Sequence, residues 1–525
     1  MSVRKGTPMV LARRAAAAVA AGIVLAAGGA VEARADEPVA PVNSAITVTT
    51  LGWGHGVGMS QYGAYGAAKS GLDYAAILAF YYPGTTLDQA GPATLRVWIK
   101  DDADGQLNVV PAAGLRVKDG DGKVKVLPVK ASKYTQWRVQ RSGSKRLLYY
   151  RNAKGRWVKY NPKLNAKTLW RVYNPKSKTV QVVLPSGSTR TYRGKLQLSF
   201  SGSSAITVNR VGLEDYLRGV VASEMPPNWS PEALRAQAVA ARSYALRYKA
   251  NLKGARLYDI CDTTACQAYL GAGNEDYRCD AAIADTAGQV VGYQGAIAYT
   301  MFTSANGGQT VAGDYPYLVA QPDPYDGLVV NQYHPFTITA AQLEKKYPSI
   351  GRFESISVAR DGVGEWGGRV QQVFVAGSAG VKTVSAASFK SAFGLRERWF
   401  NVTGGLAKGT GNYERWMDER DVNGPIGVPT GSEQVIGEGL YAPFTGGGLY
   451  WSQATGSRFL HGAVEAAYLA NGGPQGALGW PTTDVVKPVA QTLSPVSGYQ
   501  AEFTGGWIVC AAEDADPATC QVGLS

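Results

Sequence analysis

Two adjacent prolines divide the segment between Leu213 and Tyr248, and this break constrains the fold more than any other feature of the chain. Proline inside a helix removes a backbone donor and clashes with the preceding turn, so a helix must end before Pro226-Pro227. Ser230 followed by Pro231 is typical of a helix start, with serine at the N-cap and proline at the first helical position. We therefore predict one helix ending near Glu224 and a second running to about Tyr248.

The first predicted helix carries one carboxylate among apolar side chains. At about 100° per residue, Leu213, Leu217, Val220 and Glu224 fall within roughly 60° of one another. A carboxyl group on an apolar surface loses hydration when it ionises, so its pKa rises and it can act as a general acid. The alternative interpretation of Glu224 is a surface glutamate in the last helical turn.

The second predicted helix is rich in alanine and contains few polar groups. Gln237, Arg242 and Tyr244 are the polar residues that could line a sugar-binding cleft. The alternative is a buried alanine-rich helix with solvated glutamine and arginine side chains.

These helices carry a family motif. The pattern E-D-Y-L-x-G-V-V-x-S-E-M-P at residues 214–226, followed by W-x-x-E-A-L-x-A-Q-A-V-A-A-R-S-Y-A at residues 229–245, resembles the SpoIID/LytB domain of stage II sporulation protein D and its amidase-enhancer relatives. Further matches extend the resemblance over most of residues 45–402, among them C-Q-A-Y at 266–269, A-D-T-A-G at 284–288 and T-S-A-N-G-G-Q-T at 303–310, which includes Ser304 as a candidate substrate-binding residue. The resemblance implies a lytic transglycosylase of peptidoglycan glycan strands, with Glu224 as the catalytic acid.

One motif is displaced from its usual place in that family. The segment G-x-G-H-G-V-G-M-S-Q-Y-G-A at residues 52–64 normally lies near the carboxyl end of the domain, yet here it precedes the catalytic motif. A circular rearrangement is physically plausible where termini lie close together on the surface. His55, Ser60 and Gln61 are then candidates to hydrogen-bond sugar hydroxyls beside Glu224. The alternative is a structural glycine-rich turn with a histidine of the core.

The amino-terminal 35 residues are typical of a secretory signal peptide. Basic residues precede an apolar run, and Ala33-Arg34-Ala35 gives an A-x-A cleavage site. No other segment is long and apolar enough to cross a bilayer. We expect a secreted protein that associates with the cell wall.

Positive charge is concentrated between Arg116 and Lys195, where 22 Lys or Arg residues face only two aspartates and alternate with aromatic residues. Short β-prone runs broken by Gly, Pro and Asn predict an antiparallel β insert here, with the catalytic core over about 196–402. Because we expect the protein to be exported, we expect no nucleic-acid partner for this basic segment. We expect an anionic cell-wall polymer, with aromatic rings stacking on its sugars; the alternative is a merely solvated basic surface.

The tail, residues 405–525, repeats itself. Gly424–Thr430 recurs as Gly476–Thr482 at an offset of 52 residues, and Phe444–Gly447 recurs as Phe503–Gly506 at an offset of 59. Such self-similarity is typical of a repeat module. It resembles LGFP repeats, which implies attachment to the cell wall; a spacer that binds nothing is the alternative.

Five cysteines leave one unpaired thiol if disulfides form. We expect Cys510 to pair with Cys520 and favour Cys261 with Cys266, although Cys279 allows two other pairings. Some family members place zinc ligands at this point, as a Cys and a His. Here both positions are cysteine and no histidine is near in sequence, so we expect no metal and no other cofactor.

The sequence thus predicts an α+β catalytic domain with two packed helices against antiparallel sheet, a basic all-β insert and a β-rich repeat tail. The expected reaction cleaves between N-acetylmuramic acid and N-acetylglucosamine and leaves 1,6-anhydro ends. Two alternatives stay open: a non-catalytic enhancer of a cell-wall amidase and a structural wall-binding protein. The motif alone does not decide among them.

Overall fold

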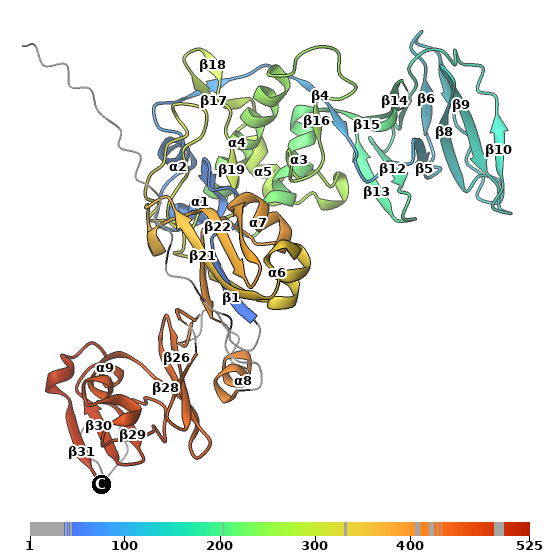
Figure 1. The fold of residues 1–525 in the computed structure, drawn as a ribbon. Coiled ribbons are helices and arrows are strands. Elements are labelled where there is room, and N and C mark those ends of the chain that lie inside the picture. The colour runs from blue at the N-terminus through green and yellow to red at the C-terminus, as the bar shows by residue number, and fades with distance from the viewer. Residues whose placement is uncertain are drawn as a thin grey trace, which may run out of the picture.

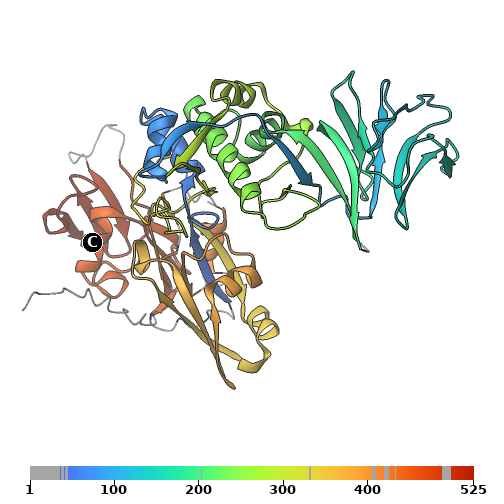
Figure 2. The same ribbon diagram turned by 90° about the horizontal axis from the view of Figure 1, so that it is seen from above.

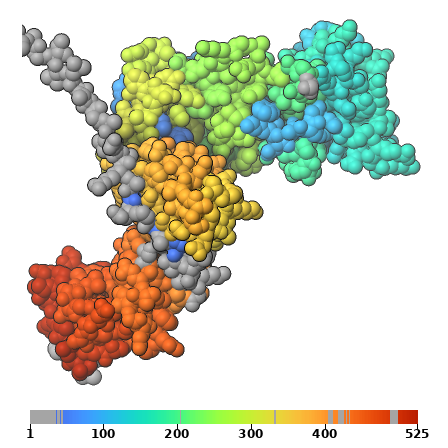
Figure 3. Space-filling view, in the orientation of Figure 1, coloured from blue at the N-terminus to red at the C-terminus, as the bar shows by residue number. Residues whose placement is uncertain are grey.

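The computed structural model describes residues 45–202, 204–329, 333–404, 410–418, 433–487 and 498–525, with residues 36, 39, 41, 425–427 and 429–431 as shorter pieces. The expected signal peptide, residues 1–35, lies outside these residues. Four bodies follow one another in space: a β-rich body, a helical body, a smaller body of helices and sheets, and the carboxyl-terminal tail (Figure 1). The β-rich body projects away from the helical body in both ribbon views (Figure 1 and Figure 2). The space-filling view shows the bodies as lobes of the molecule (Figure 3).

Helix α4 (Pro231–Ala250) is the centre of the helical body. Four helices contact it: α1 (Gln61–Lys69), α2 (Tyr74–Tyr81), α3 (Leu213–Glu224) and α5 (Tyr277–Asp285). Its alanines at 233, 236 and 240 are fully buried, and such small side chains let neighbouring helices approach closely. The predicted pair of helices is confirmed, although α4 runs to Ala250 and Ser230 makes no side-chain capping bond.

Two sheets form the β-rich body, with strand orders β10-β9-β8-β5-β12-β13 and β16-β4-β15-β14-β11-β6-β7. Every neighbouring pair is antiparallel except β16 and β4. The strands are β4 (Thr94–Trp98), β5 (Gln106–Val109), β6 (Arg116–Lys118), β7 (Val124–Val126), β8 (Gln136–Ser142), β9 (Lys145–Arg151), β10 (Trp157–Tyr160), β11 (Arg171–Tyr173), β12 (Thr179–Val183), β13 (Thr189–Arg193), β14 (Lys195–Ser201), β15 (Ser204–Gly212) and β16 (Ile260–Cys261). The predicted all-β insert is confirmed, and its two sheets extend beyond the predicted bounds of about 116–195, because β4 and β5 come before them and β15 and β16 after them.

The aromatic residues of this insert correct one expectation. Trp137 and Trp170 are 0% and 2% exposed, and the Trp137 ring packs against Tyr134, Tyr150 and Tyr160. Two sheets that face each other need a core, and large aromatic side chains fill it. These two tryptophans therefore cannot stack on a bound polymer.

Strand β1 (Ala45–Leu51) brings the two ends of the region 45–404 together. It lies between β20 (Tyr333–Thr339) and β24 (Phe400–Gly404), and pairs antiparallel with both. The remaining elements of this smaller body are β21 (Phe353–Arg360), β22 (Val370–Gly377), β23 (Gly380–Ser385), α6 (Ala340–Lys346) and α7 (Ala386–Phe393). The first strand of this region, β1, and the last, β24, are therefore neighbours in one sheet. A circular rearrangement requires that the two ends of a domain lie close together in this way.

Short strands then connect the amino-terminal segment to the helical body. Strand β2 (Met59–Ser60) pairs parallel with β19 (Phe302–Thr303). Strand β3 (Thr86–Gln89) pairs with β17 (Gln289–Tyr293), which continues into a hairpin with β18 (Ala296–Ile297). Residues 52–64 are thereby held beside the segment that follows residue 300.

The tail contains two related units. The first has α8 (Gly411–Asp418), β25 (Gln434–Ile436), β26 (Gly439–Phe444), β27 (Gly447–Ser452) and β28 (Gly456–Leu460); the second has α9 (Gly462–Ala470), β29 (Tyr499–Phe503), β30 (Gly506–Cys510) and β31 (Gln521–Leu524). In each unit the repeated Phe-Thr-Gly-Gly forms the turn of a hairpin. The repeated proline bridges to that phenylalanine in both, as Pro429 to Phe444 and Pro481 to Phe503. The repeat predicted from sequence is therefore a structural one.

The cysteines pair as expected. Disulfides join Cys261 to Cys266 and Cys510 to Cys520, and Cys279 is a free, buried thiol on α5. No helix among the described residues is long and apolar enough to span a membrane.

Candidate active site

Glu224 is the last residue of α3, and the apolar residues that precede it on the same face are buried. Leu217 and Val220 are 0% exposed, so the carboxylate follows directly on the hydrophobic core. Met225 adopts an extended conformation, and Pro226 and Pro227 follow it. The predicted stripe therefore exists, and it ends with the carboxyl group at the edge of the core.

Two groups hydrogen-bond the Glu224 carboxyl group. The backbone N–H of Ala268 donates to Oε1 at 2.6 Å, and Gln61 Nε2 donates to Oε2 over a longer 3.5 Å. Burial raises the pKa of Glu224, whereas the hydrogen bonds from these two donors favour the charged form and partly offset the rise. A carboxyl group in this position holds its proton at a higher pH than an exposed glutamate does.

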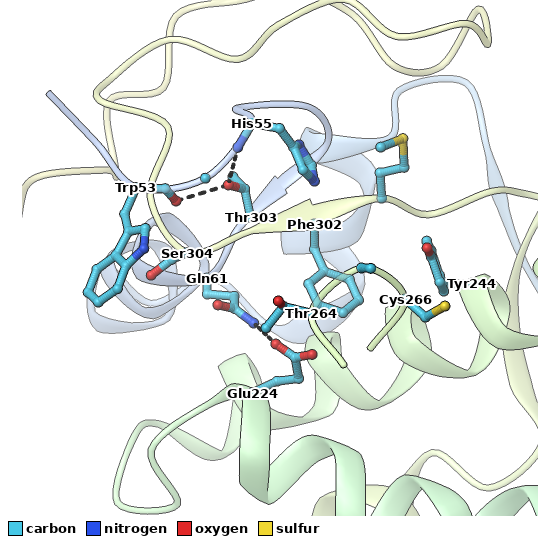
Figure 4. Close-up of a pocket in the computed structure, with 13 residues that line it drawn as sticks. Trp53, His55, Gln61, Glu224, Tyr244, Thr264, Cys266, Phe302, Thr303 and Ser304 are labelled. Carbon is cyan, nitrogen blue, oxygen red and sulfur yellow. Dashed lines mark hydrogen bonds between the residues drawn. The ribbon is translucent and has the colours of Figure 1, made fainter. Parts of the chain in front are cut away.

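The Glu224 side chain lines a cavity of about 300 Å³. Segments far apart in the sequence contribute to its wall: Trp53, Gly54, His55, Gln61, Tyr244, Thr264, Ala265, Cys266, Met301, Phe302, Thr303 and Ser304. Figure 4 shows Gln61 reaching toward Glu224, with His55 and Tyr244 farther along the same hollow. The cavity thus combines one carboxyl group and one histidine with aromatic and hydroxyl side chains, a composition that suits a polar ligand with apolar faces.

The His55 loop reaches this cavity despite its displaced place in the sequence. Thr303 Oγ1 accepts the His55 amide at 3.1 Å and donates to the Trp53 carbonyl at 3.0 Å. At Gly54, with φ +128°, a Cβ atom would lie 1.9 Å from Thr303 Oγ1, so only glycine fits. Lys390 Nζ donates to the Gly54 carbonyl at 3.0 Å and holds the loop from its other side.

His55 is neutral near pH 7. Desolvation by the surrounding protein, together with the charge of Lys390, lowers the pKa of His55 to about 4, although the residue as a whole is exposed. Its Nδ1 accepts the Val57 amide at 3.0 Å, so the neutral ring carries its hydrogen on Nε2. His55 can therefore act as a hydrogen-bond donor but not as a cation.

Ser60 has a structural role, which corrects the expectation that it contacts sugar. It is 0% exposed, its hydroxyl caps α1 by accepting the Gly63 amide, and it donates to Asp326 Oδ1 at 3.0 Å. Burial and the nearby Asp323 raise the pKa of Asp326 to about 6. This network fixes the start of α1 and so positions Gln61, the next residue along.

Two residues of α4 also lie elsewhere than expected. The Arg242 side chain is 0% exposed and forms a bidentate ion pair with Glu214, so it cannot touch a sugar in the cavity. Gln237 is 0% exposed and is absent from the cavity wall; its side chain has no hydrogen-bond partner among the residues described. Helix α4 is packed against other helices on several sides. The faces that carry Gln237 and Arg242 therefore point into the protein and not toward the cavity.

Tyr244 and Ser304 lie in the cavity wall, so their binding roles stay predictions that the geometry permits. Eight of the wall residues were not predicted as site residues from the sequence: Trp53, Gly54, Thr264, Ala265, Cys266, Met301, Phe302 and Thr303. Three of these have large apolar side chains. Trp53, 48% exposed, lies within the quoted glycine-rich motif, whereas Met301 and Phe302 come directly before the motif that begins at Thr303. Proximity to those motifs was the available signal for all three.

A disulfide closes the loop that donates to Glu224. Cys266 lines the cavity, and the loop from Cys261 to Ala268 is fixed further by Gln267, which accepts from Tyr216 and donates to the Ala241 carbonyl. Over the described part of the chain, no group of three or more His, Cys, Asp or Glu side chains is arranged to hold a metal ion. The loop is thus held by a covalent bond and by a buried amide.

Two segments of this chain match known sequence families. The sequence model of the family described as Stage II sporulation protein, SpoIID, matches residues 201–293, which contain α3, α4, α5 and the disulfide loop. The chain contains a SpoIID domain. The LGFP repeat model matches residues 426–476, within the tail. The wider limits of the SpoIID domain, residues 45–402, stay a prediction.

Three relatives of the SpoIID domain illustrate the match. The amidase enhancer of Bacillus subtilis (strain 168) is 37% identical over 116 residues, which is 21% of this chain and 15% of that protein. Stage II sporulation protein D of the same organism is 31% identical over 160 residues, 27% of this chain and 47% of that protein. An uncharacterized protein of Brachyspira hyodysenteriae is 34% identical over 131 residues, 25% of this chain and 36% of that protein. The chain therefore spans less than half the length of each relative.

The disulfide loop of the SpoIID domain gives a structural prediction. Replacing Cys261 and Cys266 with alanine should speed amide hydrogen exchange in the peptide covering residues 262–269, because the cross-link no longer restricts the loop that carries the Ala268 amide. Mass spectrometry reads this exchange peptide by peptide. Replacing Cys510 and Cys520 instead is the matched control and should leave that peptide unchanged. Equal exchange in the Cys261/Cys266 variant and in the wild type would show that the buried amides alone hold the loop.

Proposed function

We propose that this protein is an exported peptidoglycan lytic transglycosylase in which Glu224 is the catalytic acid. One observation carries the proposal: Glu224 is the sole carboxylate among the described residues that line the cavity, and its pKa is raised. Hydrolases of glycosides commonly use a pair of carboxylates. A cavity with one carboxyl group suits a reaction in which the substrate supplies its own nucleophile.

In this reaction the Glu224 carboxyl group gives its proton to the oxygen that links N-acetylmuramic acid to N-acetylglucosamine. The bond from that oxygen to C1 of the muramic residue breaks, and the C6 hydroxyl oxygen of the same residue bonds to C1. The proton of that hydroxyl passes to the Glu224 carboxylate and restores the acid. No water is consumed, and the products are a 1,6-anhydro end and a free 4-hydroxyl.

Other cavity residues would orient the strand. Trp53 offers an exposed ring to a sugar face, and the His55 Nε2 hydrogen and the Gln61 amide can donate to hydroxyl or acetamido oxygens. The Ser304 hydroxyl and Tyr244 border the same space. A positioned acid contributes most when its substrate is held in one geometry, so these contacts bear on rate as well as on affinity.

A second function is supported by a relative. The amidase enhancer of Bacillus subtilis matches this chain at 37% identity. In the enhancer interpretation, the cavity binds wall glycan without cleaving it, and the bound protein activates a separate cell-wall amidase. The position of Glu224 favours the catalytic interpretation, because a carboxyl group that lines the cavity and whose pKa is raised by burial is placed to give a proton to a bound glycan.

Two regions would keep the protein on the cell wall. The LGFP repeat tail is proposed as a wall attachment module, and the basic insert as the contact for an anionic wall polymer. Exposed cations on strands β9 and β10 and their hairpin, including Lys145, Lys154 and Lys159, could neutralise such a polymer.

Replacing Glu224 with glutamine tests the catalytic proposal. Glutamine keeps the size and most hydrogen bonding of the side chain but has no transferable proton, so 1,6-anhydro products should fall by about 10²- to 10⁴-fold while glycan binding survives. Mass spectrometry of digests of intact and peptide-stripped glycan strands measures these products. Asp215→Asn is the matched control, because it removes an exposed carboxylate from the same helix outside the cavity.

The outcomes separate the two functions. Wild-type protein that yields no anhydro ends from either substrate, yet stimulates an added amidase, would replace the catalytic proposal with the enhancer. A Glu224→Gln variant that cleaves at the wild-type rate would place the acid elsewhere.

Salt tests the role of the basic insert. A triple Lys145→Gln, Lys154→Gln and Lys159→Gln variant should bind purified cell walls more weakly at low ionic strength, where the exposed lysines attract an anionic polymer over a long range. At 0.1 M salt the range of this attraction falls to about 10 Å. In high salt, the variant and the wild type should sediment with the walls equally. Equal binding at low salt as well would show that these cations do not contact the wall.

A further inference from the structure

The second tail repeat presents a tryptophan on the open face of its sheet. Trp507 lies on β30, is 42% exposed and pairs across the sheet with Gly523 on β31. A Cβ atom at position 523 would come within 2.3 Å of the indole ring, so only a glycine lets the ring rest against the neighbouring strand. One side of the ring is thus supported by backbone while part of the indole remains open to solvent.

A groove of about 570 Å³ runs beside this ring. Gln500 and Glu502 on the adjacent strand β29 line it, with Glu502 directly opposite Trp507 in the strand register. A flat aromatic ring with amide and carboxylate oxygens beside it can stack on the apolar face of a sugar and accept hydrogen bonds from its hydroxyls.

In the described part of the first repeat, the position equivalent to Trp507 is covered. Aligning the repeated Phe-Thr-Gly-Gly turns places Gly448 at the position of Trp507. A side chain at Gly448 would collide with Glu465, Tyr441 and Tyr450, so that surface is already covered by the protein itself. The exposed ring is therefore a feature of the second repeat and is not needed to build the repeat fold.

Charge indicates what the groove can bind. Glu502 is the one charged side chain among the described residues that line it, and no Lys or Arg occurs between residues 498 and 525. The unit as a whole carries more acidic than basic side chains, with Glu513, Asp514 and Asp516 against Lys487, whose Nζ lies 5.3 Å from the centre of the Tyr499 ring. Such a surface repels phosphate- or carboxylate-bearing polymers and leaves an uncharged polyhydroxylated ligand as the complementary partner.

We propose that this groove is a binding site for a neutral polysaccharide of the cell wall, with Trp507 stacked on a sugar ring and Gln500 and Glu502 accepting from its hydroxyls. The inference rests on the proposed wall attachment of the tail and gives it a ligand class. The tail then binds neutral glycan while the basic insert binds an anionic polymer.

Affinity electrophoresis of the full chain tests the site. The chain runs in native gels that contain soluble arabinan, galactan, glucan or mannan, and in gels that contain polygalacturonate. At least one neutral polymer should slow the wild type, and Trp507→Ala should weaken that interaction about tenfold or more, the usual effect of truncating a central tryptophan. Trp507→Tyr keeps an aromatic face and should retain much of the retardation. Leu524→Ala removes an exposed apolar side chain from β31 outside the groove and should match the wild type.

Three results would overturn the proposal: no neutral polymer slows the wild type, Trp507→Ala migrates like the wild type, or Leu524→Ala loses as much as Trp507→Ala. Running each variant with Glu224→Gln added separates this site from the active site. Retardation that depends on Trp507 in a chain that forms no anhydro products supports the groove without the enzyme.

Discussion

The hydrogen bond from the Ala268 amide to the Glu224 carboxyl group is the contact on which the arrangement of the cavity depends. It joins the end of α3 to a loop closed by the Cys261–Cys266 disulfide. Burial raises the pKa of Glu224, while the amide favours the charged form and limits that rise. The carboxyl group is therefore held in one place without losing its ability to carry a proton.

The opposite wall of the cavity comes from the other end of the domain sequence. Strand β1 delivers residues 52–64 from one sheet into the helical body, where Thr303 and Lys390 hold the His55 loop and Ser60 fixes the start of α1. Buried hydrogen-bonded networks of this kind rigidify a site, because leaving any one member unpaired is costly. Residues 53–55 and Gln61 thus line the same cavity as Glu224, although more than 160 residues separate Gln61 from Glu224 in the sequence.

Much of this architecture followed from local sequence signals. The Pro226-Pro227 break and the apolar spacing before Glu224 predicted α3, and the repeated Phe-Thr-Gly-Gly turns predicted the tail. The misassigned residues share a cause: α4 is lined by alanine on several faces, so its sequence gave no hydrophobic asymmetry to show that Gln237 and Arg242 point inward. The role of the Ala268 amide could not be predicted for a different reason, because every residue except proline has a backbone N–H and the residue type does not show where it points.

A carbon-13 NMR titration of the glutamate side-chain carboxyl groups tests the central claim most directly. Comparison with Glu224→Gln assigns the Glu224 resonance, and the exposed glutamates serve as internal references. The account predicts that Glu224 titrates at a higher pH than those references, because burial disfavours its charged form. A midpoint at or below that of the exposed glutamates would contradict it, since the carboxyl group would then be ionised too readily to serve as the acid.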